Sequence, residues 1–475
     1  MSTDEREDLY SNNDEFIERL KEYEDAVNSG QPVFLDANEL AEIADYYFTH
    51  EREKDAENAL QLALSLSPGA IGPLTYRIHE ALEKEDIEAA KNYYSQIVET
   101  DSPDYVYDWA EILLAQNKHE EAEEYLREEI KKIPLSERQD YIIDIAHIYE
   151  QWGYYDLAMK WILGAQKEDT LDFKEIMAHT LFGLGKYKDS EKIFNELLDK
   201  DPYSTHYWVA LSNSQLLNED YSSAIESSEF ALAINPKDPE ALLAKANGLF
   251  HLGNYEEALK FYHRLLDAMP DNCIGMLYAG ICLVNMNRAQ EAIDMLLKAQ
   301  SMANDSYESL LPDIYHELAF AYCGNHQPDN ALKCMDDLEK LGEDKNQLLL
   351  IKGHILLSSQ RMQEAEIVFR QALESSTDTP GTLLRIVASF MENRLLKAAY
   401  ELLKKYFQIV PEDTKEGYAY LAMCYYEQKN IEAFLENLKK ACELNPTECK
   451  TVFCHLLPAE IAPEDYYTYI KDKLV

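Results

Sequence analysis

The segment FGLGKYKDS, residues 182–190, places two glycines, a lysine and a serine in an order close to that of a phosphate-binding loop. Such a loop requires Gly, four spacer residues and then Gly-Lys-Ser/Thr, because backbone N–H groups surround the phosphates while a hydroxyl reaches the metal. Here Thr180 stands where the first glycine belongs, and Lys186 is followed by Tyr187. The segment therefore does not fit a nucleotide site.

Other residues capable of chemistry also fail to form a recognisable site. Cys449, Cys454 and His455 have ligand atoms, but no second closely spaced pair completes a zinc set, so we interpret the eight cysteines as buried small apolar residues. The segment YHELAFAY, from Tyr315, lacks the second histidine of a zinc-protease helix, and neither a Gly-x-Ser-x-Gly elbow nor a glycine-rich cofactor turn occurs. We predict a non-enzymatic protein without catalytic, metal-binding or cofactor-binding residues.

The composition limits the class of partner. The chain of 475 residues carries 88 Asp and Glu against 44 Lys and Arg, a formal net charge of −44. This balance repels phosphate backbones and anionic lipid, so we expect neither nucleic-acid binding nor membrane insertion. The acidic N-terminus lacks the basic and apolar regions of a secretory signal, and the cysteines do not form a secreted disulfide pattern, so we expect a cytoplasmic protein.

An internal repeat explains the glycine-rich segment. FHLGNYEEALKFY, from Phe250, parallels FGLGKYKDSEKIF, and Gly253 follows Gly185 by twice 34 residues. Pro202, Pro236 and Pro270 recur at intervals of 34. The apolar spacing is helical, and the pattern resembles the tetratricopeptide repeat, W-x2-L-G-x2-Y followed by A-x3-F and Pro. In that reading Gly185 and Tyr187 form the turn between two helices, and Ser190 takes the place of the small residue.

The resemblance implies an all-α fold, a right-handed α-solenoid superhelix of antiparallel helix pairs. We expect an acidic leader and capping helix at residues 1–36, about twelve repeats at residues 37–446, and capping helices at residues 447–475. The small residues that let the paired helices approach are predicted to be Ala56, Ala90, Ala122, Ala158, Ser190, Ala224, Ala258, Ala292, Ala331, Ala365, Ala399 and Ala433.

In this family the first helix of each repeat lines a concave surface that binds peptides and proteins, and by resemblance the ninth repeat position points inward. Part of the inner surface is expected to be polar: Asp45, Asp108, Glu111, Asp144, His147, His179, Asn213 and Asn247. An apolar stripe is expected further along: Val209, Leu216, Leu243, Phe250, Leu277 and Ile281. Either set has an alternative role, the polar residues in bonding neighbouring helices and the apolar ones in packing between repeats.

The predicted function is a protein–protein interaction scaffold, monomeric by itself, that binds a peptide or protein segment on the concave surface. The carboxylates disfavour a ligand carboxylate and favour a segment that is basic at one end and apolar at the other. The alternative is a self-assembling structural protein whose partner is another copy of itself.

Overall fold

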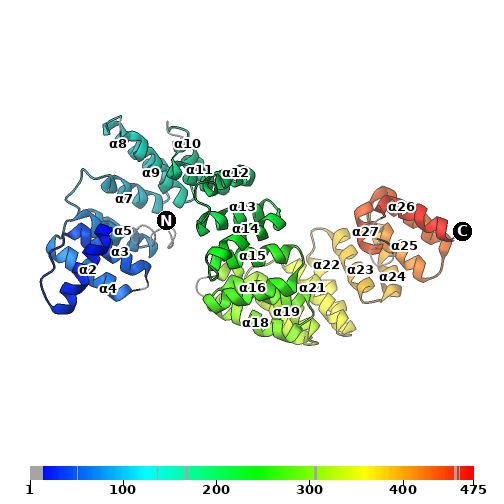
Figure 1. The fold of residues 1–475 in the computed structure, drawn as a ribbon. Helices are drawn as coiled ribbons and strands as arrows, with labels where there is room; N and C mark the ends of the chain where they lie inside the picture. Colours follow the sequence, from blue (N-terminus) through cyan, green and yellow to red (C-terminus); the bar gives the residue numbers. More distant parts are fainter. Residues whose placement is uncertain are drawn as a thin grey trace. The chain divides into compact units, whose positions relative to one another are not determined.

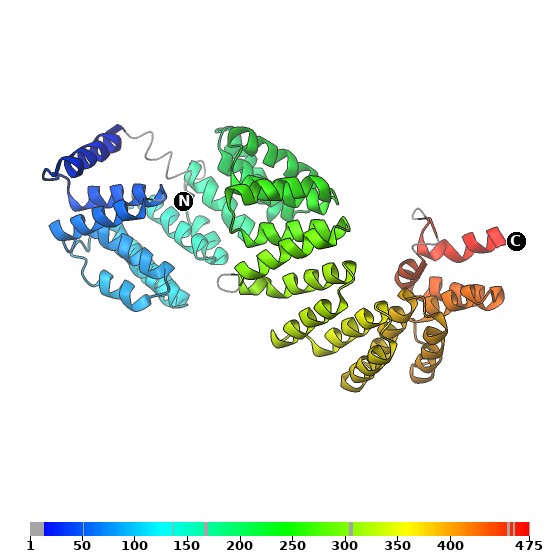
Figure 2. The same ribbon diagram turned by 90° about the horizontal axis from the view of Figure 1, so that it is seen from below.

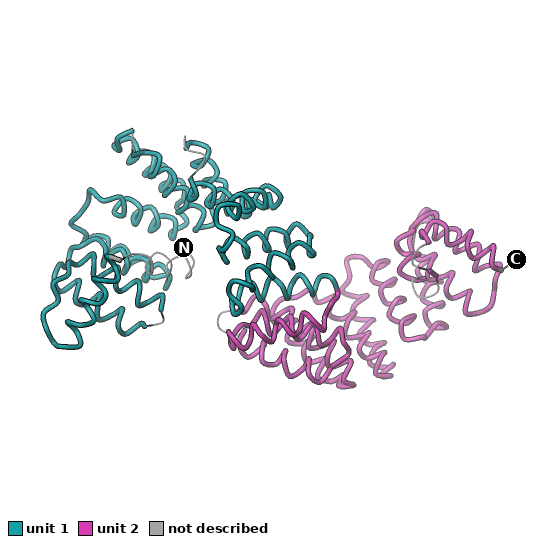
Figure 3. Tube along the Cα trace, viewed as in Figure 1, with its two compact units in different colours: residues 1–252 teal, residues 253–475 magenta. Residues whose placement is uncertain are grey.

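The structure, a computed structural model, describes residues 14–50, 52–135, 137–165, 170–303, 307–453, 457–458 and 461–474. Within these ranges the regular secondary structure is helical and no strand is present, as predicted for an all-α fold. The chain divides into two compact units, residues 1–252 (unit 1) and residues 253–475 (unit 2), which Figure 3 shows in different colours.

Unit 1 contains the helices α2 to α15, most of which are labelled in Figure 1. Their bounds are α2 Asp14–Ser29, α3 Ala37–Thr49, α4 Glu53–Leu66, α5 Ile71–Glu83, α6 Ile87–Tyr94, α7 Pro103–Ala115, α8 His119–Lys132, α9 Arg138–Gln151, α10 Tyr155–Ile162, α11 Leu171–Gly183, α12 Tyr187–Leu198, α13 Thr205–Leu217, α14 Tyr221–Ile234 and α15 Pro239–His251.

Unit 2 continues the same alternation of helices and short turns, seen from another side in Figure 2. Its elements are α16 Tyr255–Ala268, α17 Cys273–Asn285, α18 Ala289–Met302, η1 Glu308–Leu310, α19 Leu311–Gly324, α20 Pro328–Lys340, α21 Lys345–Ser358, α22 Met362–Ser375, α23 Thr379–Glu392, α24 Leu396–Ile409, α25 Tyr418–Glu427, α26 Ile431–Leu444, α27 Pro446–Phe453, η2 Pro463–Asp465 and α28 Tyr466–Leu474.

Within each unit the helices pack as consecutive antiparallel pairs, as the resemblance predicted. The pairs α3 with α4, α13 with α14, α17 with α18 and α21 with α22 have extensive contacts, and the second helix of a pair also contacts the first helix of the next, as α14 contacts α15. Each pair therefore buries one face against its partner and another against its neighbour.

The predicted small residues lie where paired helices approach. Eleven of the twelve are between 0 and 3% exposed. The exception is in the last pair, where Ala433 is only half-buried and Phe434 is 1% exposed. The predicted register was wrong there by one residue, because a large side chain fills the place that is small elsewhere, beside Ala419 and Ala422 in the same core cluster.

In the pairs from α5 with α6 to α25 with α26, the turn between the two helices contains one residue in the left-handed backbone region. Gly153, Gly185 and Gly253 occupy it with φ between 72° and 76°, values that glycine adopts without steric cost. At the corresponding turns other residues have φ between 55° and 62°: Glu85, Asn117, Glu219, Asn287, His326, Gln360, Arg394 and Lys429. Most turns thus keep the conformation without the glycine, which explains why the sequence motif is degenerate while the period persists.

The structure gives both glycines of FGLGKYKDS a conformational role. Gly183 ends α11, and a Cβ added there would overlap the ring of Tyr155 on α10. Gly185 provides the left-handed turn before α12. Ser190 is fully buried, and its hydroxyl donates a hydrogen bond of 2.8 Å to the carbonyl oxygen of Ala178 on α11. The segment is the predicted helix-to-helix turn.

The end helices cover apolar surface of the pairs beside them. Phe16 and Tyr23 of α2 are buried in one core cluster with Leu40, Ile43 and Tyr47. At the other end Phe453 of α27 and Tyr466 of α28 are buried against the last pair. Across the described ranges, none of the helices combines the length and the apolar character that crossing a bilayer requires.

We expect Gly183→Ala to lower the free energy of unfolding by about 1–3 kcal/mol, because the added methyl group overpacks the contact with Tyr155. The matched control is Gly324→Ala at the end of α19, where the new Cβ would lie 3.4 Å from the Cβ of Ala289, an ordinary contact. Urea unfolding followed by circular dichroism measures both. In a Tyr155→Ala background the cost of Gly183→Ala should shrink, and an unchanged cost would contradict the steric explanation.

Candidate functional site

Two cavities open beside the first helices of pairs in unit 1, and both include predicted site residues. The first, of about 730 Å³, is lined by residues of α3, α4 and α5, including Asp45, Tyr76 and His79. The second, of about 490 Å³, is lined by α9, α11 and α13 and includes Asp144, His147 and His179. The structure therefore brings predicted inward positions of successive repeats to shared surfaces.

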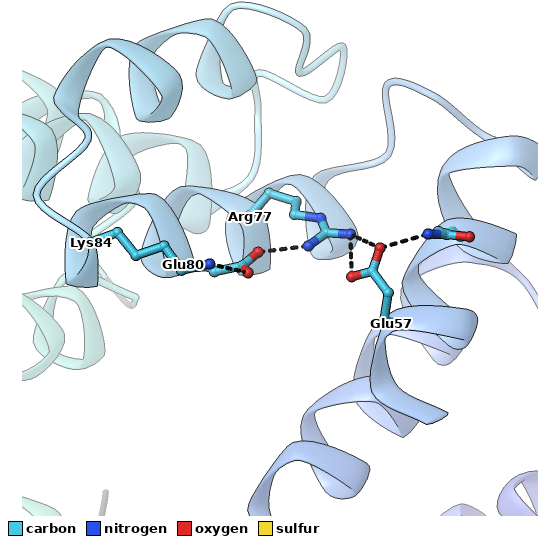
Figure 4. A network of polar contacts seen from close by, with 5 residues as sticks. Glu57, Arg77, Glu80 and Lys84 are labelled. Atoms are coloured by element: carbon cyan, nitrogen blue, oxygen red, sulfur yellow. Dashed lines mark hydrogen bonds and ion pairs between the residues drawn. The ribbon is translucent and has the colours of Figure 1, made fainter. Parts of the chain in front are cut away.

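The first cavity contains its own positive charge. Arg77 of α5 forms ion pairs with Glu57 of α4 at 2.7 Å and with Glu80 at 2.6 Å, and Lys84 pairs with Glu80 at 2.7 Å (Figure 4). Only 14% of the Arg77 side chain is exposed. The guanidinium thus satisfies two carboxylates from two helices, so this network is part of the packing between α4 and α5.

His79 connects the first cavity to the next first helix, α7. Its Nε2 lies 2.7 Å from Glu111 Oε2 and 3.5 Å from Asp108 Oδ1. Asp108 is 1% exposed and also accepts a hydrogen bond of 2.7 Å from Thr75. Burial opposes the positive charge of His79, but hydrogen bonds to Asp108 and Glu111 outweigh it and raise the pKa of His79 to about 10.

Burial also raises the pKa of Asp108 above its ordinary value, and the contacts with His79 and Thr75 offset this only in part. A ligand in the cavity cannot reach a carboxylate with 1% exposure. Asp108 and Glu111 therefore join neighbouring repeats, which is the alternative role that the sequence left open for the polar positions.

The second cavity has a different balance of charge. Its lining residues in the described chain are Ile143, Asp144, His147, Glu150, Gln151, Asp172, Glu175, Ile176, His179, His206 and Tyr207. This set has four carboxylates and three histidines, and neither Lys nor Arg is among the described lining residues. Lys174, next to Glu175, forms an ion pair with Glu196 of α12 at 2.8 Å.

The acidic residues of α7 and α9 repel one another at this surface. Desolvation raises the pKa of Asp144, the hydrogen bond of 2.8 Å from the Tyr107 hydroxyl opposes the rise, and the charges of Asp140 and Asp104 add to it. Desolvation and the charge of Asp144 likewise raise the pKa of Tyr107. Negative charge is therefore concentrated beside the second cavity, where a bound cation would relieve the repulsion.

One end of the second cavity holds two histidines and a carboxylate. The Nε2 atoms of His179 and His206 lie 3.3 Å apart, and His206 Nε2 lies 3.7 Å from Glu175 Oε1. The other carboxylate oxygen, Glu175 Oε2, accepts a hydrogen bond of 2.9 Å from the Tyr207 hydroxyl. The ring of His179 also packs edge-on against the buried Phe194, with 5.1 Å between centroids.

The remaining predicted site residues are not gathered at these two cavities. Asn213 and Val209 line a small cavity of about 90 Å³ together with His179 and His206. Four predicted site residues of unit 1 are half-buried: Asn247, Leu216, Leu243 and Phe250. In unit 2, Ile281 is half-buried. Val209 and Leu277 are each 3% exposed, the burial expected of packing residues.

Sequence reasoning did not select His206 and Tyr207, which complete the histidine end of the second cavity. His206 precedes Asn213 by seven residues, so both lie on the same face of α13. Asp172 likewise precedes His179 by seven residues on α11. The position two turns before the ninth therefore shares its face of the first helix, and scanning it would have found His206 and Asp172 but not Tyr207.

The cysteines of the described chain have the predicted packing role at most positions. Cys442 and Cys449 are buried, with 3.6 Å between their sulfur atoms, and Cys273, Cys282, Cys334 and Cys424 are also buried. Cys323 is partly exposed. Cys454 and His455 lie outside the described residues.

Sequence models of the tetratricopeptide repeat match residues 77–137, 177–239, 215–279, 317–380 and 416–448, together more than half of the chain. The chain belongs to the tetratricopeptide repeat family. The matches fall on the antiparallel helix pairs described above. They include most of α5 at the first cavity, and part of α11 and all of α13 at the second.

The curated relatives are distant. Anaphase-promoting complex subunit 7 of Homo sapiens is 23% identical over 268 residues, covering 55% of this chain and 46% of that protein. Sperm-associated antigen 1 of Rattus norvegicus is 21% identical over 327 residues, covering 61% of this chain and 35% of that protein. This tetratricopeptide repeat chain therefore spans less than half the length of either relative.

Among solved structures, the APC/C hetero-tetramer Cut9–Hcn1 is 13% identical with a TM-score of 0.38, covering 89% of this chain and 76% of that chain. PilW, a type IV pilus biogenesis factor, is 19% identical with a TM-score of 0.38, covering 45% of this chain and 97% of that chain. Likenesses of this size carry no argument about the partner of the tetratricopeptide repeats described here.

Replacing His79 tests its contacts with Asp108 and Glu111. The pKa of His79 in the folded protein, about 10, lies above the value of about 6.5 for an unfolded histidine. The stabilisation is therefore complete below about pH 6.5 and is lost as the pH rises through about 10. We expect His79→Gln to lower the melting temperature more at pH 6 than at pH 10.

The matched control is Thr75→Val, which removes the hydroxyl bound to Asp108 without removing a titrating group. It should destabilise by roughly 1–3 kcal/mol, with a pH profile parallel to that of the unmodified chain. Equal destabilisation by His79→Gln at both pH values would contradict the proposed charge on His79.

Proposed function

We propose that the chain is a protein–protein interaction scaffold and that the second cavity, between α9, α11 and α13, receives a basic segment of a protein partner. The observation that carries the proposal is the composition of its described lining, four carboxylates and three histidines without Lys or Arg. Membership of the tetratricopeptide repeat family supports a protein as the partner, because such arrays use extended concave surfaces for binding.

Charge gives the segment its chemistry. The first cavity neutralises Glu57 and Glu80 with Arg77, whereas the described lining of the second cavity has no equivalent cation. A partner Lys or Arg placed near Asp144 would also offset the charges of Asp104 and Asp140, which raise the pKa of Asp144. Electrostatic attraction of this kind chiefly accelerates association and decreases with salt.

The half-buried apolar residues of unit 1 supply the second part of the proposed surface. Leu216 lies near the C-terminus of α13, while Leu243 and Phe250 lie two turns apart on α15. Asn213 and Asn247, on the same two helices, have amides that can bond an extended peptide backbone. Val209 is omitted because it is buried, and Leu277 and Ile281 because they belong to unit 2.

The scaffold is proposed to be non-enzymatic, cytoplasmic and monomeric by itself. Its abundant carboxylates provide solubility, since a net charge of −44 opposes association between copies. Light scattering over a concentration series tests this directly. A mass that increases with concentration would favour the alternative of a self-assembling protein.

A random peptide library displayed on phage and selected on the full chain tests the chemistry of the ligand. We expect enriched sequences to contain clustered Lys and Arg. For a synthetic peptide of the enriched type, the double variant Asp144→Asn with Asp172→Asn should weaken affinity about tenfold, about 1.4 kcal/mol, mainly through slower association. Stopped-flow fluorescence separates the association and dissociation rates.

The matched control removes two carboxylates of second helices, through Asp156→Asn on α10 with Glu226→Gln on α14. Both residues are exposed, and the change in net charge is the same. This control should reduce the affinity less than twofold. Enrichment of acidic peptides, or equal losses in the two double variants, would contradict binding in the second cavity.

A further inference from the structure

We propose that Glu175, His179 and His206 form a binding site for a divalent transition-metal ion of the zinc class. Their ligand atoms all lie within 4.8 Å of one another, and the three residues are partly buried. The inference goes beyond the proposed protein partner, because metal binding can be measured without any peptide.

The spacing of the two ring nitrogens supports tetrahedral coordination. Zinc binds histidine nitrogen at about 2.0–2.1 Å, so two such nitrogens at a tetrahedral angle are separated by about 3.3 Å. The Nε2 atoms of His179 and His206 lie 3.3 Å apart. The Glu175 oxygen at 3.7 Å from His206 Nε2 requires only a small movement to become the third ligand.

The two helices present these groups for structural reasons. Glu175 and His179 are four residues apart on α11 and therefore lie on one face of that helix, one turn apart. His206 is in the first turn of α13 and faces Glu175 and His179 across the second cavity. Two ligands thus come from one rigid helix and the third from another, which limits the motion available to the set.

Neighbouring side chains fix the orientation of the ligands. Tyr207 donates to Glu175 Oε2 at 2.9 Å, which leaves Oε1 directed toward His206. Phe194, fully buried on α12, packs edge-on against the ring of His179. Hydrogen bonds and packing of this kind set the tautomer, the ring orientation and the basicity of metal ligands.

The ligand set selects the kind of ion. Imidazole suits zinc, copper, iron and nickel, whereas magnesium and calcium prefer sites made of oxygen ligands. Two histidines and one carboxylate leave a fourth position of a tetrahedral site for water or another side chain. His147 lines the same cavity, and the side chains of His206 and Glu175 are 21% and 24% exposed, so solvent reaches the site.

The cluster of His79, Asp108 and Glu111 also brings three ligand atoms together, but it suits a metal less well. It has one imidazole, whose Nε2 is already held by two carboxylates at 2.7 and 3.5 Å. An ion there would have to replace a charged contact between α5 and α7. The cluster therefore provides a control that also combines histidine with carboxylates in the same unit.

The test is titration of the full chain, first stripped with EDTA, with Zn²⁺ and with Co²⁺ alone. Competition with a chromophoric chelator measures affinity, and the visible absorption of Co²⁺ reports tetrahedral coordination. We expect one site that binds clearly more strongly than the rest of the acidic surface. Tyr207→Phe should reduce the affinity by about 10–100-fold.

His179→Gln and His206→Gln should each remove the strong site, and His79→Gln should leave it unchanged. Circular dichroism in EDTA establishes that each variant is folded. Glu175→Gln tests the third ligand with a side chain of nearly unchanged shape. If the double variant with both His179→Gln and His206→Gln binds Zn²⁺ as strongly as the unmodified chain, the ion is bound only adventitiously by other surface residues. The proposal is then wrong. An unmodified chain without tetrahedral Co²⁺ absorption would also overturn it.

Discussion

The close approach of two antiparallel helices at a small residue is the constraint on which the structure depends. Eleven of the predicted Ala or Ser positions have at most 3% exposure, and in one of them Ser190 reaches back to bond the carbonyl oxygen of Ala178. Interiors are packed too densely to accept extra methylene groups at such contacts. Gly183 shows the same limit, because the ring of Tyr155 occupies the space that a side chain would need.

Because the pairs stack regularly, equivalent residues of successive repeats become neighbours. His79 meets Asp108 and Glu111, and Glu175 and His179 meet His206, although the residues in each group come from different helix pairs. Polar side chains on the first helices therefore have two possible uses. Those that are buried stabilise the contact between repeats, and those that remain partly exposed form surfaces on which ligands can bind.

The role of the acidic side chains depends on whether neighbouring basic side chains neutralise them. Around Arg77 the carboxylates of two helices share one guanidinium, and the charge is used within the fold. Desolvation and the charges of Asp140 and Asp104 raise the pKa of Asp144, and the described lining of the adjacent cavity has no Lys or Arg. The same residue types thus act as structural ion pairs in one cavity and as a surface suited to cations in another.

The helix pairs, the small residues between them and the turn at FGLGKYKDS could be predicted from the sequence, because these follow from a local period and from contacts between adjacent helices. For the same reason the sequence predicted Asp144, His147 and His179 as inward positions, and in the structure all three line one cavity. Its register failed in the last repeat, where Phe434 replaces a small residue. The three-dimensional arrangement was needed to show that Asp108 is buried against His79, that Val209 and Leu277 are packed, and that His206 completes a group with Glu175 and His179. Those outcomes depend on side-chain directions and on distances between residues of different repeats, and a period of 34 residues specifies neither.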